Sequence, residues 1–166
     1  WSIVSKGHRN VQGLFYNSDS NLIINTEHGP LGGDEININK LYETKEKNYG
    51  WPISSYGEHY GGKEKNKENY EEAPLYKSHV DYGFIEPIKY FVPSIGITDI
   101  KKISKKFNQD FLNDYFIGAL GFTLSEGDKS IHHVRLNDEN NEVILHDVIP
   151  INERIRDIHY LKQKNK

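Results

Sequence analysis

The residues best suited to chemistry lie in one glycine-rich stretch, residues 26–37. It reads Thr-Glu-His-Gly-Pro-Leu-Gly-Gly-Asp-Glu-Ile-Asn and follows the apolar run at residues 22–24. Three glycines and one proline leave main-chain carbonyls accessible, and Asp34 and Glu35 add two carboxylates. Ca²⁺ prefers such oxygens and takes six to eight of them. The stretch therefore predicts either a Ca²⁺ site or a solvated turn whose carboxylates cap nearby amides.

Two further polar clusters could bind a ligand. Residues 7–13 carry Arg9, Asn10 and Gln12, which combine a planar guanidinium fork with two amides. Arg154 and Arg156 are two positions apart, so an extended strand would place both on one face. Two adjacent guanidinium groups repel each other unless an anion lies between them. That anion could be a ligand with several carboxylates or an acidic side chain of the protein itself. The cluster at residues 7–13 could instead stabilise the start of a strand.

Several kinds of site are excluded by the sequence. It has no Cys, which rules out a disulfide framework and thiolate chemistry. None of the eight His residues has the spacing of a metal site, and no phosphate-binding glycine loop is present. A net charge of −3 argues against a general nucleic-acid-binding protein. The apolar runs are only a few residues long, so no membrane span of about 20 residues is expected.

The elements that must position these residues are predicted to be β-hairpins. Polar turns separate β-prone segments at residues 11–16 and 22–24, at 95–100 and 115–120, and at 131–136 and 143–145. Residues 154–161 are predicted to be a strand that lacks its partner. This recurrence favours a β-propeller, although a β-sandwich would show similar hairpins. The charged residues 63–72 are predicted to be an exposed loop, and no function is assigned to them or to the similar run at 40–49.

Taken together, the motifs resemble one family. The segments at residues 7–14, 26–37 and 48–52, followed by those at 56–60, 93–95, 116–120 and 154–157, are similar to the soluble glucose and sorbosone dehydrogenases (aldose sugar dehydrogenases), which use pyrroloquinoline quinone (PQQ). The resemblance covers nearly the whole chain. It implies an all-β fold, a six-bladed β-propeller, of which residues 1–166 would form about three blades, the C-terminal half. The sequence contains no Met and begins at Trp1, which also leads us to expect a piece of a longer protein.

The resemblance also implies roles for particular residues. The carbonyls of Gly29 and Pro30 match positions that coordinate the cofactor-bound Ca²⁺, and Glu35 and Tyr49 match ligands of a second, structural Ca²⁺. The positions that match PQQ contacts are Arg9, Asn10, Gln12, Tyr60, Thr98, Arg154 and Arg156. The general base of the family is a His in the other half of the propeller. No catalytic residue is therefore expected in this chain, and neither His8 nor His28 is assigned that role.

The implied function is oxidation of a hydroxyl of an aldose or polyol, with hydride transfer to PQQ and assistance from Ca²⁺. The expected partners are the small sugar substrate, an external electron acceptor and the remainder of the propeller, in the periplasm or outside the cell. This chain alone is expected to be inactive. The alternative is a non-catalytic propeller that binds Ca²⁺ and serves as a binding or scaffold module.

Three departures from the family pattern bear on this choice. Gly121 stands where a Lys usually contacts PQQ, which removes a charge-assisted contact of about 1.5–3 kcal/mol. Gly-Ile-Thr-Asp at residues 96–99 replaces the usual Ala-Pro-Ser-Gly, so only Thr98 keeps a hydroxyl there. The interval between Glu35 and Tyr49 is also about four residues longer than usual. The loss of the Lys favours the scaffold, whereas the retained arginines favour the enzyme.

Overall fold

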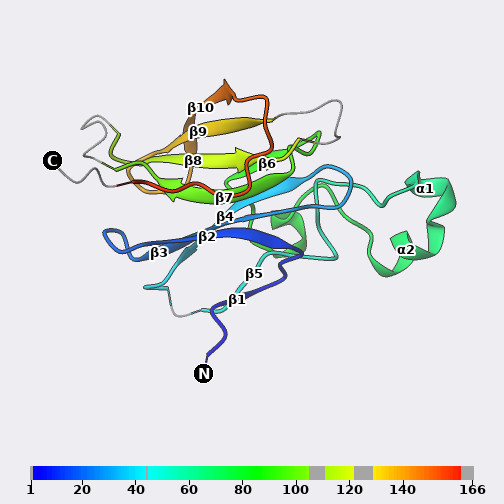
Figure 1. The fold of residues 1–166 in the computed structure, drawn as a ribbon. Coiled ribbons are helices and arrows are strands. Elements are labelled where there is room, and N and C mark those ends of the chain that lie inside the picture. The colour runs from blue at the N-terminus through cyan, green and yellow to red at the C-terminus, as the bar shows by residue number, and fades with distance from the viewer. Residues whose placement is uncertain (1, 44, 105–110, 122–128, 162–166) are drawn as a thin grey trace, which may run out of the picture.

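The computed structural model describes residues 2–43, 45–104, 111–121 and 129–161 (Figure 1). Its centre consists of two four-stranded antiparallel sheets. The first sheet has the order β2-β3-β4-β6 and is formed by β2 (Val11–Asn17), β3 (Leu22–Glu27), β4 (Asp34–Lys40) and β6 (Lys89–Phe91). The second has the order β10-β9-β8-β7 and is formed by β7 (Ile97–Lys102), β8 (Asp114–Ala119), β9 (Ser130–Leu136) and β10 (Val143–Pro150). Adjacent four-stranded antiparallel sheets are typical of consecutive propeller blades.

The smaller elements lie outside these sheets. β1 (Ser5–Lys6) and β5 (Lys47–Asn48) are two-residue strands that pair in parallel. The connection between β5 and β6 contains two short helices, α1 (Gly62–Lys65) and α2 (Lys67–Glu72), and the 3-10 turn η1 (Val80–Tyr82). Figure 1 shows α1 and α2 at the side of the molecule, away from both sheets. No residue of these two helices is buried.

The core lies between the two sheets, where β7 packs against β2 and β3. In β4, Ile36 and Ile38 alternate with Asn37 and Asn39, and all four are buried, because this strand is covered on both faces. The apolar face joins a cluster of isoleucines, leucines and aromatic residues drawn from both sheets, namely Leu22, Ile24, Ile36, Ile38, Phe91, Ile95, Ile97, Ile100, Tyr115, Ile117, Ala119, Val134 and Leu136. The opposite face of β4 carries the polar residues Asn37 and Asn39.

Polar bonds also join the two sheets. The Asn17 side-chain amide donates to the Tyr115 hydroxyl at 2.9 Å, and both residues are buried. The Thr26 hydroxyl donates to the carbonyl of Thr98, also in a buried position. Together with the apolar contacts, these two hydrogen bonds fix the position of one sheet relative to the other.

The three predicted hairpins are confirmed as β2–β3, β7–β8 and β9–β10. The first turns through residues 18–21, where the Asp19 amide donates to the Asn17 side chain at 3.1 Å and Asn21 has a φ of 50°. An Asn side chain that binds its own backbone two residues on is a common way to form such a turn. The alternation and turn signals were therefore sufficient to locate these strands.

Two predictions about local structure were wrong. Residues 154–161 do not form a strand, because they have no partner strand in the described part of the chain. They are held by the Ile155 amide, which donates to the Ala119 carbonyl at 3.1 Å, and by two side-chain bonds. Residues 63–72 are exposed, as predicted, but they are helical rather than a loop. No helix in the described residues is long and apolar enough to cross a membrane.

Candidate functional site

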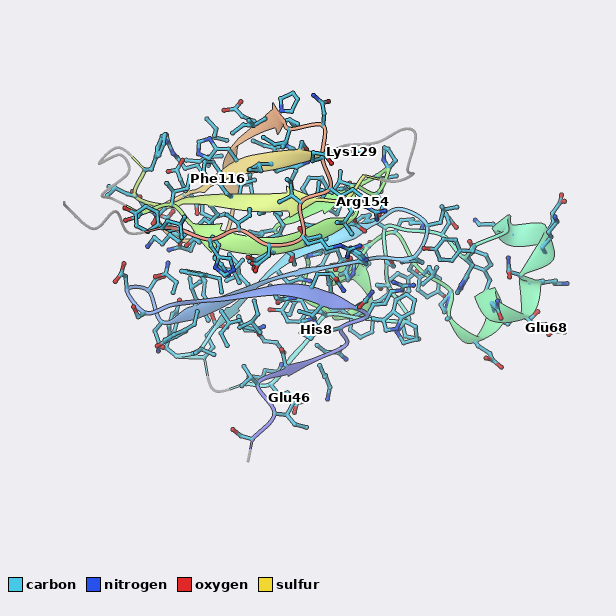
Figure 2. All side chains as sticks on the ribbon, in the orientation of Figure 1. His8, Glu46, Glu68, Phe116, Lys129 and Arg154 are labelled. Atoms are coloured by element: carbon cyan, nitrogen blue, oxygen red, sulfur yellow. The ribbon has the colours of Figure 1, made fainter. Side chains whose placement is uncertain are left out.

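A pocket of about 540 Å³ opens where loops from both sheets meet. Figure 2 shows His8, which precedes β2, and Arg154, which follows β10, at the same end of the two sheets. Its lining comes from five loops, which lie before β2 and after β3, β5, β6 and β8, and also from the start of β4 and the segment after β10. The lining residues are Arg9, Asn10, His28, Gly29, Pro30, Asp34, Tyr60, Ser94, Gly96, Leu120, Gly121 and Arg154. A volume of about 300–1,000 Å³ is usual for a small-molecule site.

One wall of this pocket is cationic. Arg9 donates from Nη1 to the His28 carbonyl at 3.1 Å, and its guanidinium lies 5.3 Å from the ring centroid of Trp51. Asn10 is held by Gln12, whose Nε2 donates to the Asn10 Oδ1 at 2.9 Å. Arg154 completes the wall from the segment after β10. Two guanidinium groups and an amide are suited to binding a ligand with several carboxylates.

Next to Arg9, the pocket is lined by His28, Gly29 and Pro30 of a tightly folded loop at residues 28–33. Gly29 cannot carry a side chain there, because a Cβ would lie 2.2 Å from the Gly33 carbonyl oxygen. The buried Asp34 carboxylate accepts hydrogen bonds from the amides of Gly29 at 3.3 Å, Ile95 at 3.1 Å and Ile97 at 3.0 Å, and from the Ser94 hydroxyl. Asp34 therefore joins this loop to the start of the second sheet and fixes the segment that carries Gly29 and Pro30, both of which line the pocket.

A smaller cavity of about 10 Å³ lies behind the first pocket, and we refer to it as the inner cavity. It has room for about one water molecule or one ion. Its lining includes Glu27, Glu35 and Tyr49, together with Trp51, Ser54 and Ser55. Arg9, His28 and Gly29 line both spaces and so form the wall between them.

Glu27 and Glu35 are both buried, with 3% and 7% of their surface exposed. Glu27 accepts bonds from the Arg9 amide at 2.7 Å and from the Asn37 side chain at 2.7 Å, and its Oε1 lies 2.9 Å from His8 Nδ1. Burial alone would raise the pKa of Glu27, but these three partners outweigh it and lower the pKa. Burial and then the neighbouring Glu27 charge raise the pKa of Glu35 to about 8.

His79 lies directly behind Glu35 and is 1% exposed. Its Nε2 is 3.6 Å from Glu35 Oε1, and its Nδ1 is 3.4 Å from Glu86 Oε2. Neither ring nitrogen has a hydrogen-bond partner among the described residues. Burial lowers the pKa of His79, so the ring is neutral near pH 7 and supplies no compensating charge to Glu35.

The structure brings most of the predicted site residues together in two groups. Arg9, Asn10, Gly29, Pro30, Tyr60 and Arg154 line the larger pocket, whereas Glu35 and Tyr49 line the inner cavity. Three predicted residues, Gln12, Thr98 and Arg156, do not line the pocket. Gln12 orients Asn10, and the Thr98 hydroxyl donates to the Ile155 carbonyl at 2.7 Å, next to Arg154.

Sequence reasoning missed the roles of two buried carboxylates. For Asp34 the alternative of a carboxylate that caps nearby amides was foreseen, but its bonds to Ile95 and Ile97 of the second sheet were not, and Glu27 was not singled out. The signal that could have found Glu27 is its place at the end of a buried strand, directly before the His-Gly-Pro turn. The two histidines nearest the site are both engaged, because His8 contacts Glu27 and Ser5 while His28 Nε2 lies 2.6 Å from the Ile97 carbonyl.

The residues present fit a hard cation at each of the two places. In the described part of the chain, no three His, Cys, Asp or Glu side chains converge as a metal site. Ca²⁺, however, also takes main-chain carbonyls, hydroxyls and water, which the loop at residues 28–33 and the inner cavity both offer. The inner cavity adds two buried carboxylates, for which a cation would be the natural partner.

The chain thus combines antiparallel sheets of the propeller type with a pocket lined by two arginines and a buried cavity lined by two glutamates. The sequence model of the Glucose / Sorbosone dehydrogenase family matches residues 1–163, and the chain belongs to this family. It is 39% identical over 119 residues to the aldose sugar dehydrogenase YliI of Escherichia coli K12, covering 71% of this chain and 29% of that protein. It is also 32% identical over 154 residues to the uncharacterized protein slr1608 of Synechocystis sp. (strain ATCC 27184 / PCC 6803 / Kazusa), covering 93% and 32% of the two chains.

Solved structures agree with this assignment. The soluble aldose sugar dehydrogenase of Escherichia coli in its apo form superposes with a TM-score of 0.71 at 35% identity, covering 93% of this chain and 40% of that one. A glucose dehydrogenase gives a TM-score of 0.70 at 32% identity, covering 92% and 39%. The predicted propeller fold is thereby confirmed, and the chain covers about 40% of each of these structures. It spans about a third of the length of the curated relatives that it matches.

Proposed function

We propose that this chain forms the cofactor-binding part of a sugar dehydrogenase that oxidises a hydroxyl of an aldose or polyol. The larger pocket would hold PQQ, with one Ca²⁺ on the carbonyls of Gly29 and Pro30 and a second at Glu35 and Tyr49. The observation that carries the proposal is that Arg9, Asn10, Gly29, Pro30, Tyr60 and Arg154 line one pocket, although they are spread over almost the whole sequence. Family membership supports the same reading.

Each wall of the pocket would have its own task. Arg9 and Arg154 would bind carboxylates of the quinone by paired charge-assisted hydrogen bonds. Asp34 would keep the carbonyls of Gly29 and Pro30 directed at the pocket, since it binds the amides on both sides of the gap between the sheets. When bound, PQQ supplies the quinone that accepts a hydride, and Ca²⁺ supplies a Lewis acid.

In the described part of the chain we expect binding and orientation but no general base. His28 lines the pocket and His8 adjoins Arg9, and both are hydrogen-bonded to protein groups. Since a general base is not expected here, we expect no sugar-dependent dye reduction by these 166 residues with PQQ and Ca²⁺ alone.

Tyr49 would bind the second cation through its main-chain carbonyl, because its hydroxyl donates to the Ile38 carbonyl at 2.6 Å.

Two arginines offer a matched test of the proposal. Arg154 lines the pocket and Arg156 does not, although both are exposed and lie two positions apart. Absorbance titration of the chain with PQQ in Ca²⁺ should show saturable binding that Arg154→Gln weakens by about tenfold, the value of one charge-assisted contact. Arg156→Gln should have a smaller effect. The absence of binding at micromolar PQQ would contradict the proposal and favour the calcium-binding scaffold, which Gly121 in the pocket wall also favours.

A further inference from the structure

The inner cavity carries one feature that family resemblance does not account for, the buried carboxylate of Glu27. We propose that Glu27 and Glu35 together bind one divalent cation of the Ca²⁺ class, and that Glu27 links occupancy of this site to the position of Arg9 in the larger pocket. This inference rests on the proposed function insofar as Glu35 is already assigned to a cation there. The second carboxylate and the link to Arg9 are new.

The two carboxylates are close enough to share one ion. The Asn37 side-chain nitrogen lies 2.7 Å from Glu27 Oε1 and 3.2 Å from Glu35 Oε2, so these oxygens are within 5.9 Å of each other, the sum of the two distances. Ca²⁺ binds oxygen at about 2.3–2.6 Å, so two ligands on opposite sides of the ion are about 5 Å apart. Both glutamates line the inner cavity, which has the size of a single ion.

The surroundings leave a negative charge that a cation would neutralise. The ion-pair partners given by the described residues are two histidines, His8 at 2.9 Å from Glu27 and His79 at 3.6 Å from Glu35. The ring of His79 is 1% exposed, faces Glu35, and has no hydrogen bond within the described part of the chain. Arg9 also lines the cavity, but its guanidinium donates to the carbonyl of His28. A cation between two carboxylates buried next to each other would compensate the charge of both.

Glu27 connects this site to the larger pocket through the backbone. Its Oε2 accepts the Arg9 amide at 2.7 Å, and the Arg9 side chain then lines the pocket proposed for the quinone. Arg9, His28 and Gly29 form the wall between the two spaces. A cation that fixes the Glu27 carboxylate would therefore fix the strand entry that carries Arg9, and a ligand on Arg9 would in turn strengthen cation binding.

Terbium luminescence tests this site without any quinone. Tb³⁺ replaces Ca²⁺ at oxygen sites and emits when a nearby indole is excited, and Trp51 lines the inner cavity. Titration of the chain should give saturable emission that Ca²⁺ displaces. Glu27→Gln and Glu35→Gln should each weaken Tb³⁺ binding by at least about tenfold, since even groups outside the ligand shell often contribute that much. Glu139→Gln, an equal charge change on an exposed turn of the second sheet, should leave it unchanged.

The controls separate a ligand from a structural residue. Trp51→Phe should reduce the emission while calorimetric Tb³⁺ affinity stays the same, which locates the ion at this cavity. If Glu27→Gln fails to fold by circular dichroism, Glu27→Asp keeps the charge and should still weaken binding. Wild-type Tb³⁺ affinity in a folded Glu27 variant would overturn the inference and leave the PQQ pocket standing. Tb³⁺ binding at the inner cavity does not depend on PQQ. A failure of PQQ to bind would therefore contradict the proposed function and leave this inference standing.

Discussion

Asp34 offers the sharpest test of how the loop at residues 28–33 is held. Asp34→Asn keeps the shape of the side chain but replaces one carboxylate oxygen by an amino group. One oxygen accepts the amides of Ile95 and Ile97, and the other accepts the Gly29 amide and the Ser94 hydroxyl. An amino group in place of Oδ2 would face the amides of Ile95 and Ile97, whereas one in place of Oδ1 faces the Gly29 amide and can donate to the Ser94 hydroxyl, which also accepts. In the less costly orientation one buried hydrogen bond is lost, and the remaining bonds lose their charge assistance.

The loss of one buried charge-assisted bond should lower the free energy of unfolding by about 1.5–3 kcal/mol. For a chain of this size, that corresponds to a decrease in melting temperature of roughly 3–12 °C. Urea denaturation followed by circular dichroism measures the change, with Asp138→Asn on the exposed turn between β9 and β10 as the matched control. The control should change stability by less than about 0.5 kcal/mol. A loss below about 1 kcal/mol for Asp34→Asn would refute the reasoning that this carboxylate joins the loop to the second sheet.

Three further predictions concern other contacts. Tyr115→Phe removes the bond to Asn17 and leaves a buried amide without that acceptor, so unfolding free energy should fall by about 1–3 kcal/mol; an unchanged urea midpoint would contradict the role of this bond between the sheets. Gly121→Lys restores a cation at the pocket but imposes a side chain at a φ of 77°, so stability should fall by about 1–2 kcal/mol while PQQ affinity rises, and unchanged PQQ affinity would show that position 121 does not face the ligand. Burial alone would raise the pKa of Glu86, but hydrogen bonds from the Val80 amide, the Tyr56 hydroxyl and the His79 amide lower it. The stability contributed by ionised Glu86 is therefore fully present above the ordinary glutamate pKa near 4.5 and is lost as pH falls through the lowered pKa. Glu86→Gln should flatten the acid limb of a plot of unfolding free energy against pH, and an identical limb would contradict this.

The sequence predicted the hairpins because alternating apolar residues and Asn- and Ser-rich turns are local signals. It also indicated which loops line the larger pocket, since Arg9, Gly29 and Arg154 stand in recognisable motifs. The strand predicted for residues 154–161 failed because strand formation requires a partner, and no partner strand is present in the described part of the chain. Local composition alone could not reveal this.

The division of the site into two spaces could not be predicted from sequence either. Glu27 and Glu35 belong to adjacent antiparallel strands, and their register places them directly opposite each other. Only that pairing brings their carboxylates within reach of Asn37 and of one cation. The contacts of Asp34 with Ser94 and Ile97 likewise span 60 and 63 residues. Such contacts depend on how one sheet packs on the next, which no single segment encodes.

A crystal structure of the chain grown with PQQ and Ca²⁺ would show whether the larger pocket holds the quinone. We expect the quinone in this pocket, with its carboxylates at Arg9 and Arg154 and a Ca²⁺ ion on the carbonyls of Gly29 and Pro30. A quinone bound elsewhere, or a pocket left empty at saturating PQQ, would contradict this expectation.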